Sequence, residues 1–397
     1  MPRSERRPDA LAGSRQIWGW NLALHPSEFL ADQLTLSLDR LGLTTLDVCL
    51  LHNPEYYFSE AIHRGDTDQE KLRTEFYARL ERAFRYFETQ VREGRLRYYG
   101  VSSNTAASPS GDPEATSLDR MIQAAQSAAE SVGSARHHFQ VLQYPMDLFE
   151  SRAALTANTG PSHSQTVLEY ATHNHIAVLV NRPLNAMVGQ NRMLRLADLP
   201  LDEEPIDFNR HLGELGALEQ DYRSSIAPHI EGIGTDLTPT DFFKWSIELQ
   251  RVRPQIQGLE HWEQIEHRMI APQVNQVFQR LERSLSGDVA ERWTAWRQRY
   301  VPIFLTLLRG LRHEATARSR AQADRVTETI DPFLPAPRLA SSLSQKALWV
   351  LSSTPGVTCV LNGMRTTRYV EDSLSILKWE PLKETTPIYE GMTKLTF

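Results

Sequence analysis

Five short apolar runs of the sequence are each followed by side chains that can hydrogen-bond, hold a proton or bind an anion. Imidazole, amide and hydroxyl groups suit a carbonyl or carboxamide, and guanidinium groups suit a phosphate. Run by run, these residues are His52 and Asn53; Ser102, Ser103 and Asn104; Gln143; Asn181 and Arg182; and Asn362, Gly363, Arg365 and Arg368. Singly, each is explained by a turn or a solvated helix start. Their recurrence after five successive runs favours one shared ligand site.

The apolar runs are predicted to be strands that alternate with helices. The predicted strands cover residues 46–52, 96–103, 139–144, 176–180 and 357–361, and the predicted helices 25–42, 67–93, 113–132, 164–174, 343–353 and 366–378. The nearly continuous apolar run 46–52 is typical of a strand buried on both faces. Strands joined by crossover helices form a parallel sheet, and ligands bind at the carboxyl ends of its strands. The polar residues are therefore predicted to meet at one edge of an α/β sheet.

Between about residues 190 and 335 this alternation stops. The segment carries Arg, Glu, Gln, Leu and Trp at helical spacing and is predicted to contain no strand. Its tryptophans, Trp245, Trp262, Trp293 and Trp296, are expected to form the core of a small bundle. We thus expect three segments: 1–190, the first part of the α/β fold; 191–335, a large all-helical insertion; and 336–397, the last strand and helices with a C-terminal tail.

Composition narrows the classes of partner and site. The formal net charge of −6 over 397 residues provides no basic field for nucleic acid or a membrane surface. No stretch approaches the length of a membrane span. Cys49 and Cys359 lie in apolar runs, so we expect buried, reduced thiols in a cytoplasmic protein. The histidine pairs lack the acidic or cysteine ligands of a metal site, and no Rossmann, P-loop or nucleophile-elbow motif occurs.

Five segments resemble, in the same order, parts of the aldo/keto reductase family. They are residues 38–54, Leu38-Asp39-Arg40-Leu41-Gly42 through Leu50-Leu51-His52-Asn53-Pro54; Gly100-Val101-Ser102-Ser103-Asn104; Gln143-Tyr144-Pro145; Val180-Asn181-Arg182-Pro183-Leu184; and Gly363-Met364-Arg365 with Glu371-Asp372. The resemblance covers about residues 20–190 and 340–380. The helical insertion is not part of the common family pattern.

The resemblance implies an (α/β)8 TIM barrel, incomplete at the N-terminus, that binds NADP(H) and transfers hydride between it and a small-molecule carbonyl or alcohol. His52 would be the catalytic histidine that orients the carbonyl oxygen. Ser102, Ser103, Asn104 and Gln143 would hold the nicotinamide, and Asn181 and Arg182 stand where the family has the residue that stacks on it. Gly363, Met364, Arg365, Arg368 and Asp372 would lie by the phosphate and adenine.

The family's tyrosine acid and its lysine partner have no counterpart, because residues 1–51 contain neither Tyr nor Lys. Two interpretations follow. In the first, the chain is an N-terminally truncated oxidoreductase that is inactive as given. In the second, it is a non-catalytic relative that binds a nucleotide or a partner. An open five-stranded sheet exposes its edges and one apolar face, which a protein partner or self-association is expected to cover.

Overall fold

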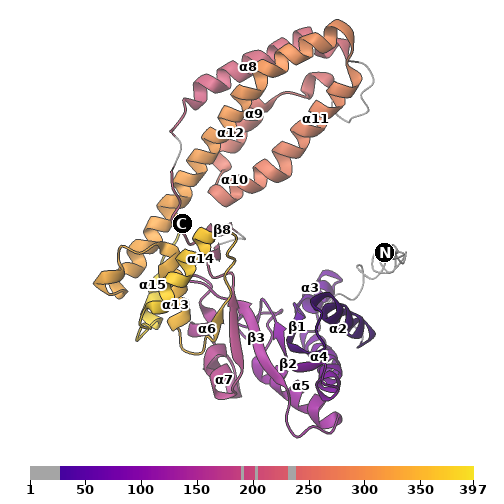
Figure 1. Cartoon of the computed structure of the whole chain (residues 1–397), viewed down its shortest axis with the longest axis vertical. Helices are drawn as coiled ribbons and strands as arrows, with labels where there is room; N and C mark the ends of the chain where they lie inside the picture. The colour runs from indigo at the N-terminus through magenta and orange to yellow at the C-terminus, as the bar shows by residue number, and fades with distance from the viewer. Residues whose placement is uncertain (1–26, 189–191, 202–203, 231–237) are drawn as a thin grey trace. The chain divides into compact units, whose positions relative to one another are not determined.

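The computed structural model describes residues 27–188, 192–201, 204–230 and 238–397 (Figure 1). The chain divides into two compact units. Unit 1 comprises Met1–Ala186 and Pro335–Lys394, and unit 2 comprises Met187–Leu334 and Leu395–Phe397. Each unit is described by itself.

Unit 1 is built on a five-stranded parallel sheet. The strands are β1 (Leu46–His52), β2 (Leu96–Ser102), β3 (Phe139–Pro145), β6 (Ala177–Asn181) and β9 (Cys359–Val360), and they lie in that order. All five overlap the predicted strands, and the α/β class with a parallel sheet is confirmed. Among the described residues β1 and β9 are the edges of this sheet, so the closed eight-stranded barrel stays a prediction.

Helices connect the strands. They are α2 (Ser27–Leu41), α3 (Tyr56–His63), α4 (Gln69–Arg92), α5 (Leu118–Ser131), α6 (Arg152–Leu155), α7 (Val167–His173), α13 (Leu343–Ser353), α14 (Thr367–Leu374) and α15 (Thr386–Thr393) (Figure 1). Among them, α4, α7 and α13 pack on the sheet. Phe84 and Phe87 of α4 pack on Tyr99 of β2, with ring centroids 5.0 and 5.4 Å away. These rings are fully or almost fully buried, so the face of the sheet that carries Tyr99 holds the core of the unit.

The opposite face of the sheet is partly open. Alternation along β1 and β2 places Val48 and Tyr98 on it as register partners, and their side chains are 39% and 43% exposed. The prediction that 46–52 is buried on both faces is therefore wrong, because β1 is an edge strand covered on one side only. The expectation of buried thiols is also wrong for Cys359, which is exposed on the other edge strand, while Cys49 is half-buried.

Unit 2 is a helical bundle with an aromatic core. Its helices are α8 (Phe208–Ser225), α9 (Trp245–Val252), α10 (Leu259–Ile265), α11 (Ala271–Ser284) and α12 (Gly287–Ile330), with a π-helical turn, η5 (Glu266–Ile270), between α10 and α11. Trp293, Trp296 and Tyr300 stack along α12. The four tryptophans expected in the core are buried there.

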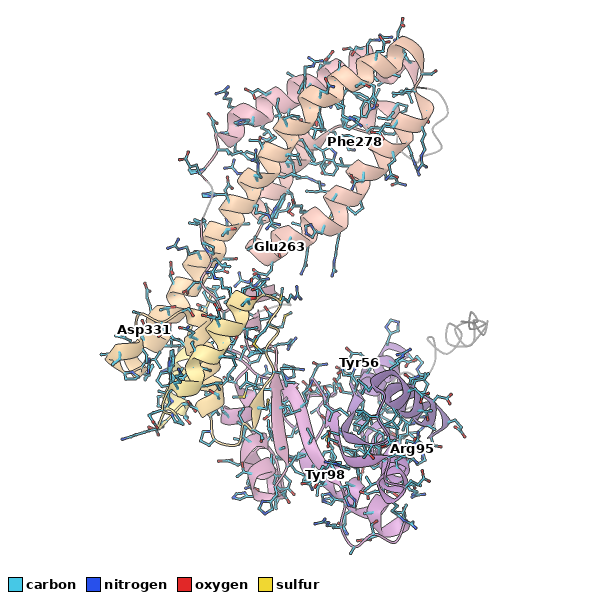
Figure 2. All side chains as sticks on the ribbon, viewed as in Figure 1. Tyr56, Arg95, Tyr98, Glu263, Phe278 and Asp331 are labelled. Atoms are coloured by element: carbon cyan, nitrogen blue, oxygen red, sulfur yellow. The ribbon has the colours of Figure 1, made fainter. Side chains whose placement is uncertain are left out.

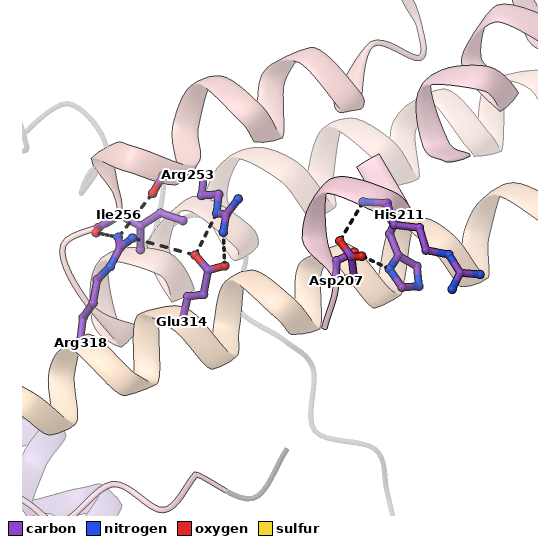
Figure 3. Close-up of polar contacts among 7 residues, drawn as sticks. Asp207, His211, Arg253, Ile256, Glu314 and Arg318 are labelled. Atoms are coloured by element: carbon purple, nitrogen blue, oxygen red, sulfur yellow. Dashed lines mark hydrogen bonds and ion pairs between the residues drawn. The ribbon is translucent and has the colours of Figure 1, made fainter. Parts of the chain in front are cut away.

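Polar pairs join the helices of the bundle (Figure 3). Arg253 makes two hydrogen bonds to the carboxylate of Glu314 on α12, at 2.7 and 3.0 Å. Arg318, one turn further along α12, donates to the backbone carbonyls of Arg253 and Ile256. At the start of α8 the Asp207 carboxylate accepts a hydrogen bond from the backbone N–H of Arg210, which caps the helix.

Two short two-stranded sheets add to this architecture. The antiparallel one pairs β4 (Ala157–Thr159) with β5 (Gln165–Thr166). The other pairs β7 (Asn185–Val188) with β8 (Arg192–Arg195). The prediction of an all-helical segment over 191–335 is wrong at β8, because a four-residue strand is too short to show a period of two. Among the described helices, none is long and apolar enough to cross a membrane.

Candidate functional site

Strand register brings the sequence-predicted polar residues together at the carboxyl ends of neighbouring strands. His52 is paired in register with Ser102, and Ser102 with Gln143. Asn181 is paired with Pro145, two residues beyond Gln143, so Asn181 points to the same face. The Gln143 amide donates a hydrogen bond from Nε2 to Ser102 Oγ at 3.1 Å. Four strands thus contribute one polar group each to the carboxyl end of the open face.

His52 ends β1 with an exposed side chain that makes no hydrogen bond to a described residue. The chain then turns sharply at Asn53, whose φ is +50°. Asparagine tolerates this left-handed conformation better than most residues, which explains its place directly after the strand. The imidazole of His52 is therefore free to contact a ligand.

Glu55 lies directly after this turn and was not predicted from the sequence. Its side chain is only 1% exposed, and its Oε1 accepts hydrogen bonds from the backbone N–H and the side-chain Nδ2 of Asn104, at 2.8 and 3.0 Å. Its Oε2 is buried without a hydrogen-bond partner. Glu55 therefore ties the loop after β1 to the loop after β2 and fixes Asn104.

Ser103 points away from the open face. Its hydroxyl lies 3.0 Å from Thr116 Oγ1, and its side chain is buried. Its backbone N–H donates to the carbonyl of Gln143. Ser103 therefore holds the two strands together, whereas Ser102 and Asn104 are the residues of this loop that border the site.

Comparison with known proteins supports the first part of this arrangement. Residues 17–110, about a quarter of the chain, match the sequence model of the aldo/keto reductase family. This stretch is similar to part of an aldo/keto reductase. It contains His52, Ser102, Ser103 and Asn104. The predicted resemblance to the family is confirmed, and the match covers the first two of the five segments. No curated protein matches the sequence at a significant level.

Solved aldo-keto reductases are found among similar structures. A thermostable aldo-keto reductase, Tm1743, in complex with the inhibitor epalrestat, shares 11% identity at a TM-score of 0.39, covering 94% of this chain and 69% of that one. The aldo-keto reductase AKR11C1 from Bacillus halodurans, in its holo form, shares 13% identity at a TM-score of 0.40, covering 98% and 76%. Neither score reaches 0.5, so the fold described above stands on this chain's own strands and helices.

Beyond the matched residues 17–110, a second polar cluster lies after β3 and β6. Asp147 is fully buried; its Oδ1 accepts from the backbone N–H groups of Phe149 and Glu150, at 2.7 and 2.9 Å, and its Oδ2 has no hydrogen-bond partner. Burial raises the pKa of Asp147 well above its ordinary value, and the neighbouring charge of Glu150 raises it further. Burial therefore favours the protonated form of Asp147, although the two N–H donors favour the carboxylate. This buried carboxyl is not predicted by the sequence.

Arg182 closes this second cluster. Its φ of +57° is uncommon for arginine, and its guanidinium pairs with Glu150 at 2.6 Å. The Oδ1 atom of the preceding Asn181 is buried without a hydrogen-bond partner. Asn181 thus presents an unsatisfied acceptor at the carboxyl end of β6, whereas Arg182 is already engaged by an acidic side chain.

The predicted phosphate residues lie around the start of α14. Arg365 and Arg368 are exposed and make no hydrogen bond or ion pair with a described residue. Gly363 and Met364 are also exposed there. Asp372 is engaged elsewhere, because its carboxylate accepts hydrogen bonds from Ser342 and Ser344, at 3.1 and 2.6 Å. Asp372 therefore joins α14 to the start of α13.

The two carboxyl side chains that the sequence does not predict share one property. Glu55 and Asp147 are acidic side chains in loops that directly follow a strand, and both are buried. Their position directly after a strand is the one sequence signal that could have indicated them. Burial of a carboxylate in a loop depends on the residues that pack around it, which the local sequence does not show. Among the described residues, no group of three His, Cys, Asp or Glu side chains is placed to hold a metal ion.

Proposed function

We propose that unit 1 binds NADP(H) along the carboxyl ends of its parallel strands and that this chain derives from an oxidoreductase acting on a carbonyl or alcohol. The observation that carries the proposal is the alignment of His52, Ser102 and Gln143 on one face of β1–β3. The matched residues 17–110 include the first two of these residues.

The polar atoms of the site fit a nicotinamide carboxamide. A carboxamide has donor and acceptor groups, and Ser102, Gln143 and Asn104 provide hydroxyl and amide partners for both. The Oδ1 atom of Asn181 is a buried acceptor still without a donor, which the carboxamide NH2 group would supply. When bound, the cofactor supplies the hydride.

The cofactor phosphates and the substrate carbonyl are assigned to residues of the start of α14 and of β1. We place Arg365 and Arg368 on the phosphate groups, because both guanidinium groups are unpaired and lie at the start of a helix. His52 would orient the carbonyl oxygen by a hydrogen bond. No general acid is assigned, since the sequence preceding His52 holds neither Tyr nor Lys.

Titration of the chain with NADPH, followed by quenching of its tryptophan fluorescence, tests the proposal. We expect saturable quenching that is weakened in Arg365→Gln and Arg368→Gln. Absence of saturable binding would contradict the cofactor assignment. Carbonyl reduction should then be assayed on the same sample, which separates cofactor binding from turnover.

The exposed side chains of the open face favour a second candidate, a non-catalytic protein that binds a partner through its sheet. Val48 and Tyr98 lie together on that face and are substantially exposed. Exposed apolar surface on an edge strand promotes association. Light scattering after size-exclusion chromatography tests this alternative. A partner-binding protein should run as a complex larger than the monomer, the Val48→Lys variant should run as the monomer, and neither protein should bind NADPH.

A further inference from the structure

The amino ends of the same strands form a separate hollow of about 470 Å³. Its lining includes Thr45 before β1, Arg97 and Tyr98 on β2, and Arg136 and His138 before β3. Arg95 and Tyr98, labelled in Figure 2, mark this part of unit 1. A volume of several hundred Å³ accommodates a small ligand. This hollow lies at the opposite ends of the strands from the site proposed above.

A buried carboxylate orients the histidine of this hollow. Glu88 of α4 is fully buried, and its Oε2 accepts a hydrogen bond from His138 Nδ1 at 2.8 Å. Its Oε1 accepts from the backbone N–H of His138 at 2.7 Å and from the Tyr99 hydroxyl at 2.9 Å. Because a carboxylate only accepts, the Nδ1 atom of His138 carries the proton. The Nε2 atom is thus the ring nitrogen left to contact a ligand, and it has no partner among the described residues.

Two guanidinium groups border the hollow. Arg136 is exposed and makes no hydrogen bond or ion pair with a described residue. Arg97 pairs with Asp47 at 2.9 Å, but both side chains are more than two-thirds exposed, so this pair is weak and exchangeable. Guanidinium groups match the oxygen geometry of phosphate and carboxylate groups. The hollow therefore combines two cationic groups with one oriented imidazole.

We propose that this hollow is a binding site for a phosphoryl group, held by Arg97, Arg136 and His138. A phosphoryl group has three terminal oxygens, which can meet all three of these groups at once, whereas a carboxylate has two. The exposed ring of Tyr98 offers a surface for the organic part of a phosphate ester.

Isothermal titration calorimetry of the full chain with phenyl phosphate, inorganic phosphate and benzoate tests the proposal. We expect saturable binding of phenyl phosphate that weakens about tenfold in Arg136→Gln, from the loss of one charged hydrogen bond. His138→Gln should weaken it similarly. Arg152→Gln, an exposed arginine after the carboxyl end of β3, is the matched control and should bind as the wild type does.

The outcomes separate the ligand sources and the two proposed sites. Tighter binding of phenyl phosphate than of inorganic phosphate supports an ester as the ligand, and equal binding supports free phosphate; both support a phosphoryl site. Benzoate binding as tightly as phenyl phosphate would overturn it. Binding of phenyl phosphate that is lost in Arg365→Gln but kept in Arg136→Gln would also overturn the proposed phosphoryl site. Arg136 and Arg365 are exposed, so their glutamine variants are expected to fold. A failure of the chain to bind NADPH would not affect this test, because it measures the binding of phenyl phosphate.

Discussion

The Gln143 amide on β3 donates a hydrogen bond to the Ser102 hydroxyl on β2 at 3.1 Å, between residues that are register partners in the sheet. Both side chains therefore hold fixed positions at the carboxyl ends of their strands. A cofactor that binds there meets groups already oriented by the sheet, which reduces the entropy lost on binding.

Replacing Gln143 tests this relationship. In Gln143→Leu the amide is removed while a side chain of similar size remains, so the affinity for NADPH should fall about tenfold with little change in thermal stability. Fluorescence titration measures the affinity. Gln33→Leu, on the exposed surface of α2, is the matched control. Equal affinities of the two variants would show that Gln143 does not contact the cofactor.

Removing the Glu55 carboxylate should destabilise unit 1. Glu55→Ala removes the acceptor of the Asn104 backbone N–H and leaves its Nδ2 with Asn53 Oδ1 alone, which costs about 1–3 kcal/mol of unfolding free energy. Urea unfolding monitored by circular dichroism measures the loss. The exposed Glu371→Ala should remain within about 0.5 kcal/mol of the wild type. A loss in Glu55→Ala no greater than in this control would contradict the buried role of Glu55.

The raised pKa of Asp147 predicts a pH dependence of stability. In the folded chain Asp147 holds its proton to a higher pH than in the unfolded chain, so its contribution is fully present below the ordinary aspartate pKa of about 3.9. This stabilisation is lost as the pH rises through the pKa of Asp147 in the folded chain. The loss is about 1.4 kcal/mol of unfolding free energy for each unit by which folding raises that pKa.

Asp147→Asn should therefore remove this decline, because an amide does not titrate in this range. Its Oδ1 can still accept from the Phe149 and Glu150 N–H groups. Unfolding free energies of both proteins, measured from about pH 4 to pH 8, should diverge as the pH rises, with the variant relatively more stable at the upper end. Parallel curves would exclude a raised pKa at Asp147.

Gly100 is required for the pairing of β2 with β3. A Cβ atom at this position would lie 2.0 Å from the backbone oxygen of Val141, at the point where the register shifts. Gly100→Ala should therefore cost about 3 kcal/mol or more and lower the melting temperature. Gly111→Ala, where a Cβ atom meets nothing within 4 Å, should be nearly neutral in the same thermal melts. Similar melting temperatures for the two variants would contradict this account.

The amino-acid sequence alone predicts the five strands of the parallel sheet, the longer helices of unit 1 and the polar residues that follow each strand, but not the short elements α3, α6, α15, β4 and β5. It does so because a buried strand leaves an apolar run, a helix leaves a period of 3.6, and both signals are local. The lack of Tyr and Lys before His52 is likewise a property of composition alone.

Which of these residues face one another, and which are already hydrogen-bonded, depends on the tertiary fold. Ser103 and Ser102 are neighbours in sequence, yet strand alternation turns one toward Thr116 and the other toward Gln143. The burial of Glu55 and the exposure of β1 depend on what packs against them, and no local pattern records that. Burial is a sum over distant contacts, whereas periodicity belongs to the segment itself.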